Sequence, residues 1–239
     1  DNVSYYNNVN GTLQLVNSQL HTPSGFPVYG GQIVIPTVVD IDADGYLDYF
    51  VGDISGRLAY YAGQGYADTG PLFEFVSDYF ENIQIIWTPA RHGANSISFY
   101  DLDNDSDLDL IWGDFYQPGL FYLENYGDNT DPHFVDSLMV DDFPGSGMLE
   151  TAGFNIPIIT DFEPDGTGDL VVGVLSGAYG TDYIHNLAYF KNNGTVDEYD
   201  FQLITMDLLP GLDLIAGSRP VLIDLDGDNG NQFSFPFGR

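Results

Sequence analysis

The chain has 239 residues, which allows one or two domains, and its 44% apolar and 15% aromatic content is typical of a globular protein. It carries 36 acidic and 5 basic residues, a formal net charge of −31. This balance argues against nucleic acid or an anionic membrane as partner and favours cations. The sequence has no cysteine and no run of about 18 apolar residues that would predict a membrane span. It begins at Asp1 without a Met or a signal segment, as a mature secreted form or a fragment would.

The N-terminal segment, residues 3–19, predicts two strands. The first, in "VSYYNNVNGT", carries a pair of tyrosines, and the second lies in "LQLVNSQL". Asn-Gly between two such runs is typical of a tight hairpin turn. The segment therefore predicts two strands that precede any complete repeat.

The first complete repeat opens with an Asp-rich loop, "DIDADGYLD", at residues 40–48. Its centre resembles the loop of a calcium-binding EF-hand, but position 12 is Val51 rather than the bidentate Glu of that motif. The following "LDYFVGD" is typical of a strand that is apolar on both faces, as expected for a strand packed between two neighbouring sheets. A strand with paired aromatics, "LAYYAGQG", and a further strand in "FEFVSDYF" come next.

The same succession returns along the chain. The loops "DLDNDSDLD", "DFEPDGTGD" and "DLDGDNGNQ" begin at Asp101, Asp161 and Asp224, at intervals of 61, 60 and 63 residues from Asp40 onward. Aromatic-pair strands recur in "LFYLENYG" and "LAYFKNNG", and outer strands are expected in "HFVDSLMV" and "FQLITMDL". No segment has a helical period. The pattern predicts a single domain over 1–239 with repeats at about 37–97, 98–157, 158–220, and 221–239 joined with 1–36.

The last repeat is split between the two ends of the chain. "PVLIDLDGDNGNQFSFPFG" supplies the loop and the strand after it, whereas residues 3–19 supply the aromatic-pair strand and the outer strand. The two ends are therefore expected to complete one blade, either within one molecule or between two. Unpaired, each would present an open strand edge.

This loop-then-strand pattern resembles the FG-GAP/VCBS repeat family, whose members include integrin α-like propellers of secreted proteins. The resemblance implies an all-β, β-propeller-like array of about four blades of some 60 residues, with Asp-rich calcium loops and one blade split between the termini. It leaves open a closed four-bladed ring, a part of a larger propeller, and closure between subunits.

The resemblance also implies the calcium ligands. Side chains at loop positions 1, 3, 5 and 9 and the backbone carbonyl at position 7 would bind Ca²⁺, which prefers six to eight oxygens. The expected ligands of the first three loops are Asp40, Asp42, Asp44, Tyr46 and Asp48; Asp101, Asp103, Asp105, Asp107 and Asp109; and Asp161, Glu163, Asp165, Thr167 and Asp169. The fourth loop keeps Asp224, Asp226 and Asp228 but has Gln232 at position 9, with Asn229 and Asn231 as other candidate ligands. Three sites are thus expected, and a fourth remains open.

Other chemistry has weaker support in the sequence. The histidines, His21, His92, His133 and His185, show no metal spacing and are expected in loops or on the surface. The paired aromatics, expected as interblade core with sugar stacking as the alternative, are Tyr5, Tyr6, Tyr60, Tyr61, Phe121, Tyr122, Tyr189 and Phe190. Sequons begin at Asn2, Asn10, Asn104 and Asn193, so the chain is either a glycoprotein or uses these asparagines in turns.

These observations predict an extracellular or cell-surface, calcium-stabilised, non-catalytic module used in adhesion or in self-assembly as a filament or ring through strand exchange. Its partners would be itself, glycans or surface proteins, with no nucleic acid and no membrane span. The alternative is a carbohydrate-binding or polysaccharide-degrading propeller enzyme, for which the five basic residues supply little to bind an anionic polysaccharide.

Overall fold

The computed structural model describes residues 2–31, 35–53, 55–84, 95–145, 147–175, 185–210, 220–223 and 232–234. Within these ranges the chain is all-β, and all pairs of named strands are antiparallel. The helical segments of the described chain are two 3-10 turns, η1 (Phe80–Asn82) and η2 (Asp136–Leu138). The expected all-β class is confirmed.

Three sheets contain four strands each, joined in chain order. The first sheet consists of β3 (Thr37–Val39), β4 (Asp48–Gly52), β5 (Leu58–Ala67) and β6 (Gly70–Ser77). The second consists of β7 (Asn95–Tyr100), β8 (Asp109–Asp114), β9 (Leu120–Leu123) and β10 (Val140–Phe143). The third consists of β11 (Asn155–Thr160), β12 (Asp169–Val174), β13 (Leu187–Asn192) and β14 (Phe201–Thr205).

Two hairpins lie at the ends of the chain. The N-terminal hairpin pairs β1 (Tyr5–Val9) with β2 (Thr12–Asn17), and the C-terminal hairpin pairs β15 (Val221–Ile223) with β16 (Gln232–Ser234). The turn of the N-terminal hairpin has positive φ at both Asn10 (53°) and Gly11 (79°), as a tight Asn-Gly hairpin turn requires.

The strands on either side of each Asp-rich loop have the same register in all four repeats. The residue before the loop pairs with loop position 9, which is the first residue of the next strand. These pairs are Val39–Asp48, Tyr100–Asp109, Thr160–Asp169 and Ile223–Gln232. The C-terminal hairpin therefore corresponds to the first two strands of a sheet, which is the part that the sequence assigns to it.

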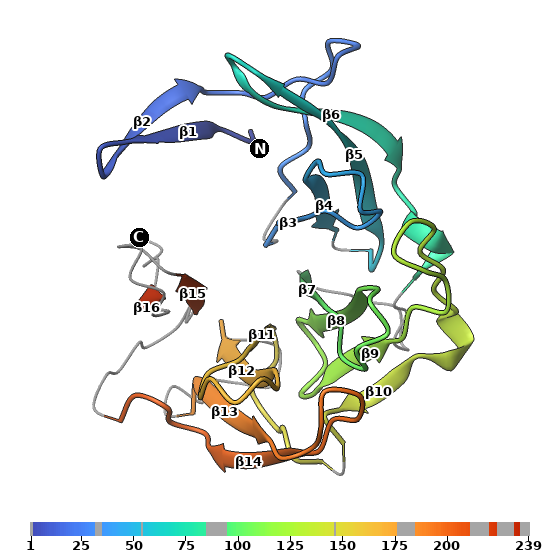
Figure 1. The fold of residues 1–239 in the computed structure, drawn as a ribbon, viewed down its shortest axis with the longest axis vertical. Helices are drawn as coiled ribbons and strands as arrows, with labels where there is room; N and C mark the ends of the chain where they lie inside the picture. Colours follow the sequence, from blue (N-terminus) through green and yellow to red (C-terminus); the bar gives the residue numbers. More distant parts are fainter. Residues whose placement is uncertain are drawn as a thin grey trace.

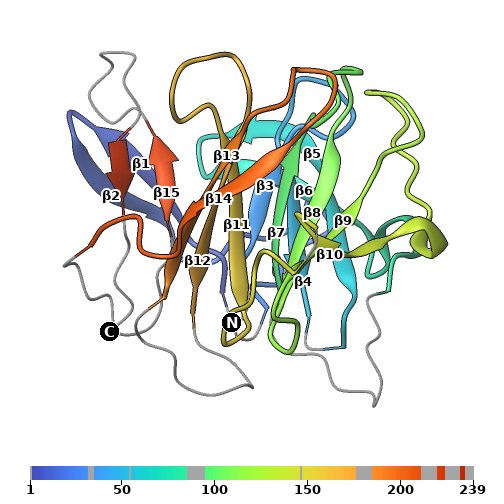
Figure 2. The same ribbon diagram turned by 90° about the horizontal axis from the view of Figure 1, so that it is seen from below.

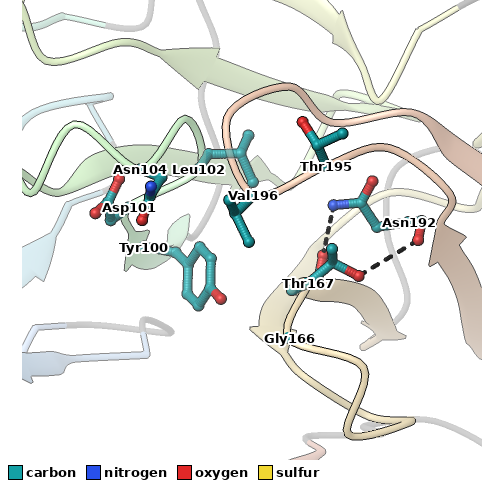
Figure 3. A pocket seen from close by; sticks show the side chains of 10 residues that line it. Tyr100, Asp101, Leu102, Asn104, Gly166, Thr167, Asn192, Thr195 and Val196 are labelled. Carbon is teal, nitrogen blue, oxygen red and sulfur yellow. Dashed lines mark hydrogen bonds between the residues drawn. The ribbon is translucent and has the colours of Figure 1, made fainter.

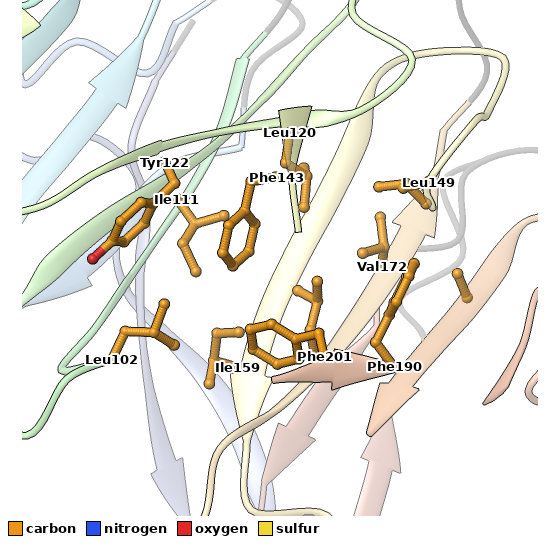
Figure 4. Close-up of a cluster of buried hydrophobic side chains, with 12 residues drawn as sticks. Leu102, Ile111, Leu120, Tyr122, Phe143, Leu149, Ile159, Val172, Phe190 and Phe201 are labelled. Atoms are coloured by element: carbon orange, nitrogen blue, oxygen red, sulfur yellow. The ribbon is translucent and has the colours of Figure 1, made fainter. Parts of the chain in front are cut away.

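The second strand of each complete sheet is buried at every position, as its apolar sequence predicts. Successive side chains point to opposite faces and enter different hydrophobic clusters. In β8, Leu110 and Trp112 pack with the first sheet, whereas Ile111 packs with the third sheet. Figure 4 shows the cluster between the second and third sheets, where Phe143 of β10 and Phe201 of β14 lie near each other, with ring centroids 5.6 Å apart. The sheets are thus held together by interblade core.

The sheets are arranged around a centre in a propeller-like way (Figure 1). The first strands, β3, β7 and β11, lie nearest the centre, and the fourth strands, β6, β10 and β14, lie at the periphery. Both views place the two terminal hairpins on the same side of this arrangement (Figures 1 and 2). The hairpins form separate two-stranded sheets, so the pairing expected between them is not among the described strand pairs, and the shared blade stays a prediction.

Two details of the sequence prediction need correction. The outer strand of the second sheet is β10, Val140–Phe143, which shares only Val140 with "HFVDSLMV". Phe134 pairs with Asn125 as Phe201 pairs with Asn192 in the third sheet, but η2 then interrupts the strand. The paired aromatics of the three complete sheets are buried or packed against the clusters, which supports interblade core, but Tyr6 is 51% exposed. Tyr6 differs because the described chain places no sheet against that side of the N-terminal hairpin.

Candidate metal centres

The three described Asp-rich loops, called loop 1 (residues 40–48), loop 2 (101–109) and loop 3 (161–169), are folded by their own aspartates. Asp40 accepts hydrogen bonds from the amides of Asp44 and Gly45 at 3.1 and 3.0 Å, and Asp161 accepts the equivalent pair at 3.0 and 2.9 Å. Position 6 has positive φ in each loop: Gly45 (89°), Ser106 (80°) and Gly166 (91°). The first aspartate thus closes the loop into a tight turn through hydrogen bonds to amides four and five residues later.

The aspartate at position 9 is a buried clamp in every described loop. One carboxylate oxygen accepts the amide of position 2, and the other accepts an amide from the third strand or its end. In loop 1, the amides of Ile41 and Gly63 donate to the clamp residue Asp48 at 3.0 and 2.7 Å. In loop 2, the amides of Leu102 and Asn125 donate to the clamp residue Asp109 at 3.2 and 2.9 Å. In loop 3, the amides of Phe162 and Asn192 donate to the clamp residue Asp169 at 3.2 and 2.8 Å. The clamp residues are at most 1% exposed, so these bonds tie the loop to the sheet interior.

A tyrosine completes each clamp, which the sequence analysis did not identify. The Tyr189 hydroxyl donates to Asp169 Oδ2 at 3.3 Å, and Tyr60 and Tyr122 form the equivalent side-chain hydrogen bonds to Asp48 and Asp109. Burial raises the pKa of all three tyrosines, and the adjacent carboxylates raise it further, so the phenols remain protonated donors. The recurrence of a Tyr at the same place in three aromatic-pair strands was the available sequence signal.

Loop 2 fits a divalent cation best. Carboxylate oxygens of Asp101, Asp103 and Asp105 lie within 4.8 Å of one another. In addition, Asp101 Oδ1 and Asp107 Oδ1 are buried without a hydrogen-bond partner. Burial raises the pKa of Asp107 and of Asp109 to about 7, and Asp105 beside Asp107 adds repulsion there. A bound cation would supply the positive charge and the binding partner that these oxygens lack. Asp107 was expected to offer only its carbonyl, yet the residue is 3% exposed and its carboxylate is buried beside that of Asp105.

Loop 1 forms a similar centre, in which the convergent group includes the buried clamp residue Asp48. Oxygens of Asp40, Asp42 and Asp48 converge within 4.8 Å, and burial raises the pKa of Asp42 and Asp48. Asp44 is exposed and lies outside this convergent group, although its carboxylate accepts the amide of Tyr46 at 2.8 Å. Three of the four expected side-chain ligands are therefore together. The ligand role of the Tyr46 carbonyl stays a prediction.

Loop 3 has a different arrangement. Glu163 and Asp165 form ion pairs with Lys191, the single lysine of the chain. The hydroxyl of Thr167 donates to Asp165 Oδ1 at 2.6 Å and, with the Thr167 amide, lowers the pKa of Asp165. Within the described residues, no three acidic side chains of this loop converge as those of loops 1 and 2 do. A third calcium site is thus the least well supported of the three.

The remaining expected site residues are partly outside the described chain. Asp224, Asp226 and Asp228 of the fourth loop, and His92, lie outside the described residues. His133 and His185 form exposed pairs with Glu81 and Asp207, at 3.3 and 3.2 Å, as surface histidines.

A small cavity of about 60 Å³ separates loop 2 from loop 3 (Figure 3). Tyr100, Asp101 and Asn104 line one side, and Thr167 and Asn192 line the other. Its volume is far below the roughly 300–1,000 Å³ typical of organic-ligand sites. The cavity has room for about two waters.

Comparison with known families identifies the repeat. Residues 40–112, which contain loops 1 and 2, match the family model FG-GAP_3, described as an FG-GAP-like repeat. The FG-GAP-type repeat suspected from the sequence is confirmed in this stretch. A comparison with curated protein sequences finds no match.

Solved structures that match the chain include an Agrocybe aegerita lectin described as specifically recognising non-reducing terminal N-acetylglucosamine. The match has 19% identity and a TM-score of 0.44, over 82% of this chain and 44% of the lectin chain. A Bacillus licheniformis rhamnogalacturonan lyase, PL11, matches at 14% identity and a TM-score of 0.38, over 97% of this chain and 47% of its own. The chain spans less than half the length of both proteins.

Proposed function

We propose that the chain is a secreted, calcium-stabilised, non-catalytic module that binds or assembles outside the cell or at its surface. The observation that carries the proposal is loop 2, where three carboxylates converge beside buried, unpartnered oxygens of Asp101 and Asp107. Oxygen-only ligands in this number suit calcium, and binding to a site absent from the unfolded chain adds to folding stability.

A structural role for the metal follows from what the loops hold. Each loop connects the first strand to the buried second strand, and its clamp aspartate also binds the third strand. Cation binding would therefore fix three strands at once. The first and ninth aspartates of each loop accept hydrogen bonds from backbone amides, which supports a scaffold role over a catalytic pair.

The split blade supports assembly. The N-terminal hairpin exposes apolar side chains, with Leu13 70%, Leu15 54% and Val16 42% exposed. The C-terminal hairpin offers the complementary first and second strands. Pairing of the two hairpins, within one molecule or between subunits, would cover open edges. Exchange between subunits would build a ring or filament.

Two measurements test the proposal. Asp101→Ala and Asp40→Ala should each reduce the stabilisation by calcium, whereas Asp68→Ala, an exposed residue in the β5–β6 turn, should leave it unchanged. The mass in solution, measured with calcium and with chelator on the full chain and on a chain lacking residues 1–12, tests assembly. Loss of oligomers on this deletion supports exchange, and a monomeric parent contradicts it.

The enzyme alternative makes a different prediction. If Asp101→Ala remained as stable as the parent but lost turnover of a polysaccharide, a polysaccharide-degrading role would replace the one proposed. Binding of a glycan without turnover would instead identify the carbohydrate-binding form of the module.

In the part of the chain that the structure describes, the two helical segments are three residues long each, far short of a membrane span.

A further inference from the structure

One position beside each loop differs in charge from blade to blade. The residue concerned immediately precedes the third-strand amide that binds the clamp aspartate. Because the amides of Gly63, Asn125 and Asn192 make the same bond in their blades, the preceding residues are structurally equivalent. These equivalent residues are Ala62, Glu124 and Lys191.

Lys191 faces the acidic side chains of loop 3. Its ammonium group pairs with Glu163 Oε2 and lies 3.2 Å from Asp165 Oδ2. The lysine side chain is 27% exposed, so the ion pair is partly shielded from water. Glu163 and Asp165 are the expected ligands at positions 3 and 5. The ammonium group therefore uses two carboxylates that a calcium ion would need.

A calcium ion and this ammonium group would compete. Calcium requires carboxylate oxygens at about 2.3–2.6 Å, and a lysine bound to the same oxygens would place a second positive charge within a few ångströms. Like charges at that separation repel strongly in a partly buried site. Calcium binding to loop 3 would thus first require displacement of Lys191.

Glu124 has the opposite effect on loop 2. It occupies the position in the second sheet that Lys191 occupies in the third, because the amide of Asn125 that follows it donates to Asp109 Oδ1 at 2.9 Å. Loop 2 therefore combines five aspartates with a neighbouring glutamate, whereas loop 1 has the neutral Ala62 at the equivalent position. A more negative site attracts a divalent cation more strongly.

We propose that Lys191 is a built-in cation that lets loop 3 fold without calcium, and that this equivalent position orders the calcium affinity of the loops as loop 2, then loop 1, then loop 3. The proposal rests on the proposed calcium binding for its affinity order. The neutralisation of loop 3 by Lys191 stands on the ion pairs alone.

The test compares four full-length proteins by isothermal titration with calcium and by thermal unfolding in chelator. They are the parent, Lys191→Met, Lys191→Arg and Ala62→Lys. Lys191→Met should bind one more calcium ion than the parent, or bind its weakest ion at least tenfold more tightly. It should also unfold at a lower temperature than the parent in chelator, because Glu163 and Asp165 then face each other without a cation. Lys191→Arg keeps the charge and, although its guanidinium group differs in shape, should stay closer to the parent than Lys191→Met in both measurements.

Ala62→Lys is the reciprocal change and should remove or weaken at least tenfold one calcium site. If Ala62→Lys does not fold, Glu124→Gln tests the same structural position with a side chain of equal size. It should weaken one calcium site. A parent that binds calcium while Lys191→Met leaves both its calcium binding and its unfolding in chelator unchanged would overturn the inference and keep the proposed function. A parent that binds no calcium would contradict the proposed function and the affinity order together.

Discussion

Asp169→Ala should destabilise the fold even in the absence of metal. Asp169 is 0% exposed, and its carboxylate accepts the amides of Phe162 and Asn192 at 3.2 and 2.8 Å. Each buried donor left without a partner costs about 1–3 kcal/mol, so the two amides together cost about 2–6 kcal/mol. Burial raises the pKa of Asp169, which means that its ionised form already carries a desolvation cost. That cost offsets part of the loss, and the expected net effect is about 2–4 kcal/mol.

Urea unfolding in chelator measures this loss, because the midpoint and slope together give the free energy of unfolding. Loop 3 suits the experiment since Lys191 forms ion pairs with Glu163 and Asp165 of this loop. Asp165→Ala is the matched control: Asp165 is exposed, and its removal should change stability far less than the removal of Asp169. Asp169→Asn, which keeps one acceptor oxygen, should lose an intermediate amount and covers the case in which the alanine variant does not fold. An Asp169→Ala protein as stable as the Asp165→Ala control would refute the clamp.

Other predictions concern loop 2. Ser106 has φ of 80° at the position where loops 1 and 3 have glycine. Ser106→Gly should therefore stabilise the protein by about 0.5–1 kcal/mol, a net value that includes the entropy cost of the added glycine. Gly166→Ser should destabilise the protein by a similar amount in the same urea titrations. A loss on Ser106→Gly would contradict the backbone argument. Since burial raises the pKa of Asp107 and Asp109 to about 7, the metal-free folded state holds protons that the unfolded state releases near pH 4. Stability in chelator should therefore fall as pH rises from about 4 to 7 and level off above pH 7, and a thermal midpoint that rises from pH 5 to 7 would contradict the assignment. Calcium should remove this fall, because it binds the ionised carboxylates.

The repeat, its loops and the buried second strands could be predicted because their signals are local. Asp40, Asp42 and Asp44 lie within five residues of one another in the sequence. The residues of β8 and β12 are apolar on both faces of the strand, which predicts that both faces are covered. These features need no knowledge of which strand lies against which.

Contacts between distant parts of a repeat could not be predicted in the same way. Tyr189 and Asp169 are 20 residues apart, and Lys191 reaches Asp165 across 26 residues. Their meeting depends on the third strand lying beside the loop, which the Asp spacing alone does not specify. The late start of β10 likewise depends on η2, which interrupts the chain between Phe134 and Val140. The contact between Lys191 and the carboxylates of loop 3 therefore could not be predicted without knowing where the third strand lies.

The central claim is that calcium stabilises the fold by binding these loops, and the thermal midpoint of the full chain in millimolar calcium and in chelator tests it most directly. Convergent carboxylates in loops 1 and 2 and the unpartnered buried oxygens of loop 2 predict a higher midpoint with calcium. The shift should shrink in Asp101→Ala, which removes a member of the loop 2 group, and persist in Asp68→Ala. The same midpoint in calcium and in chelator would contradict the account.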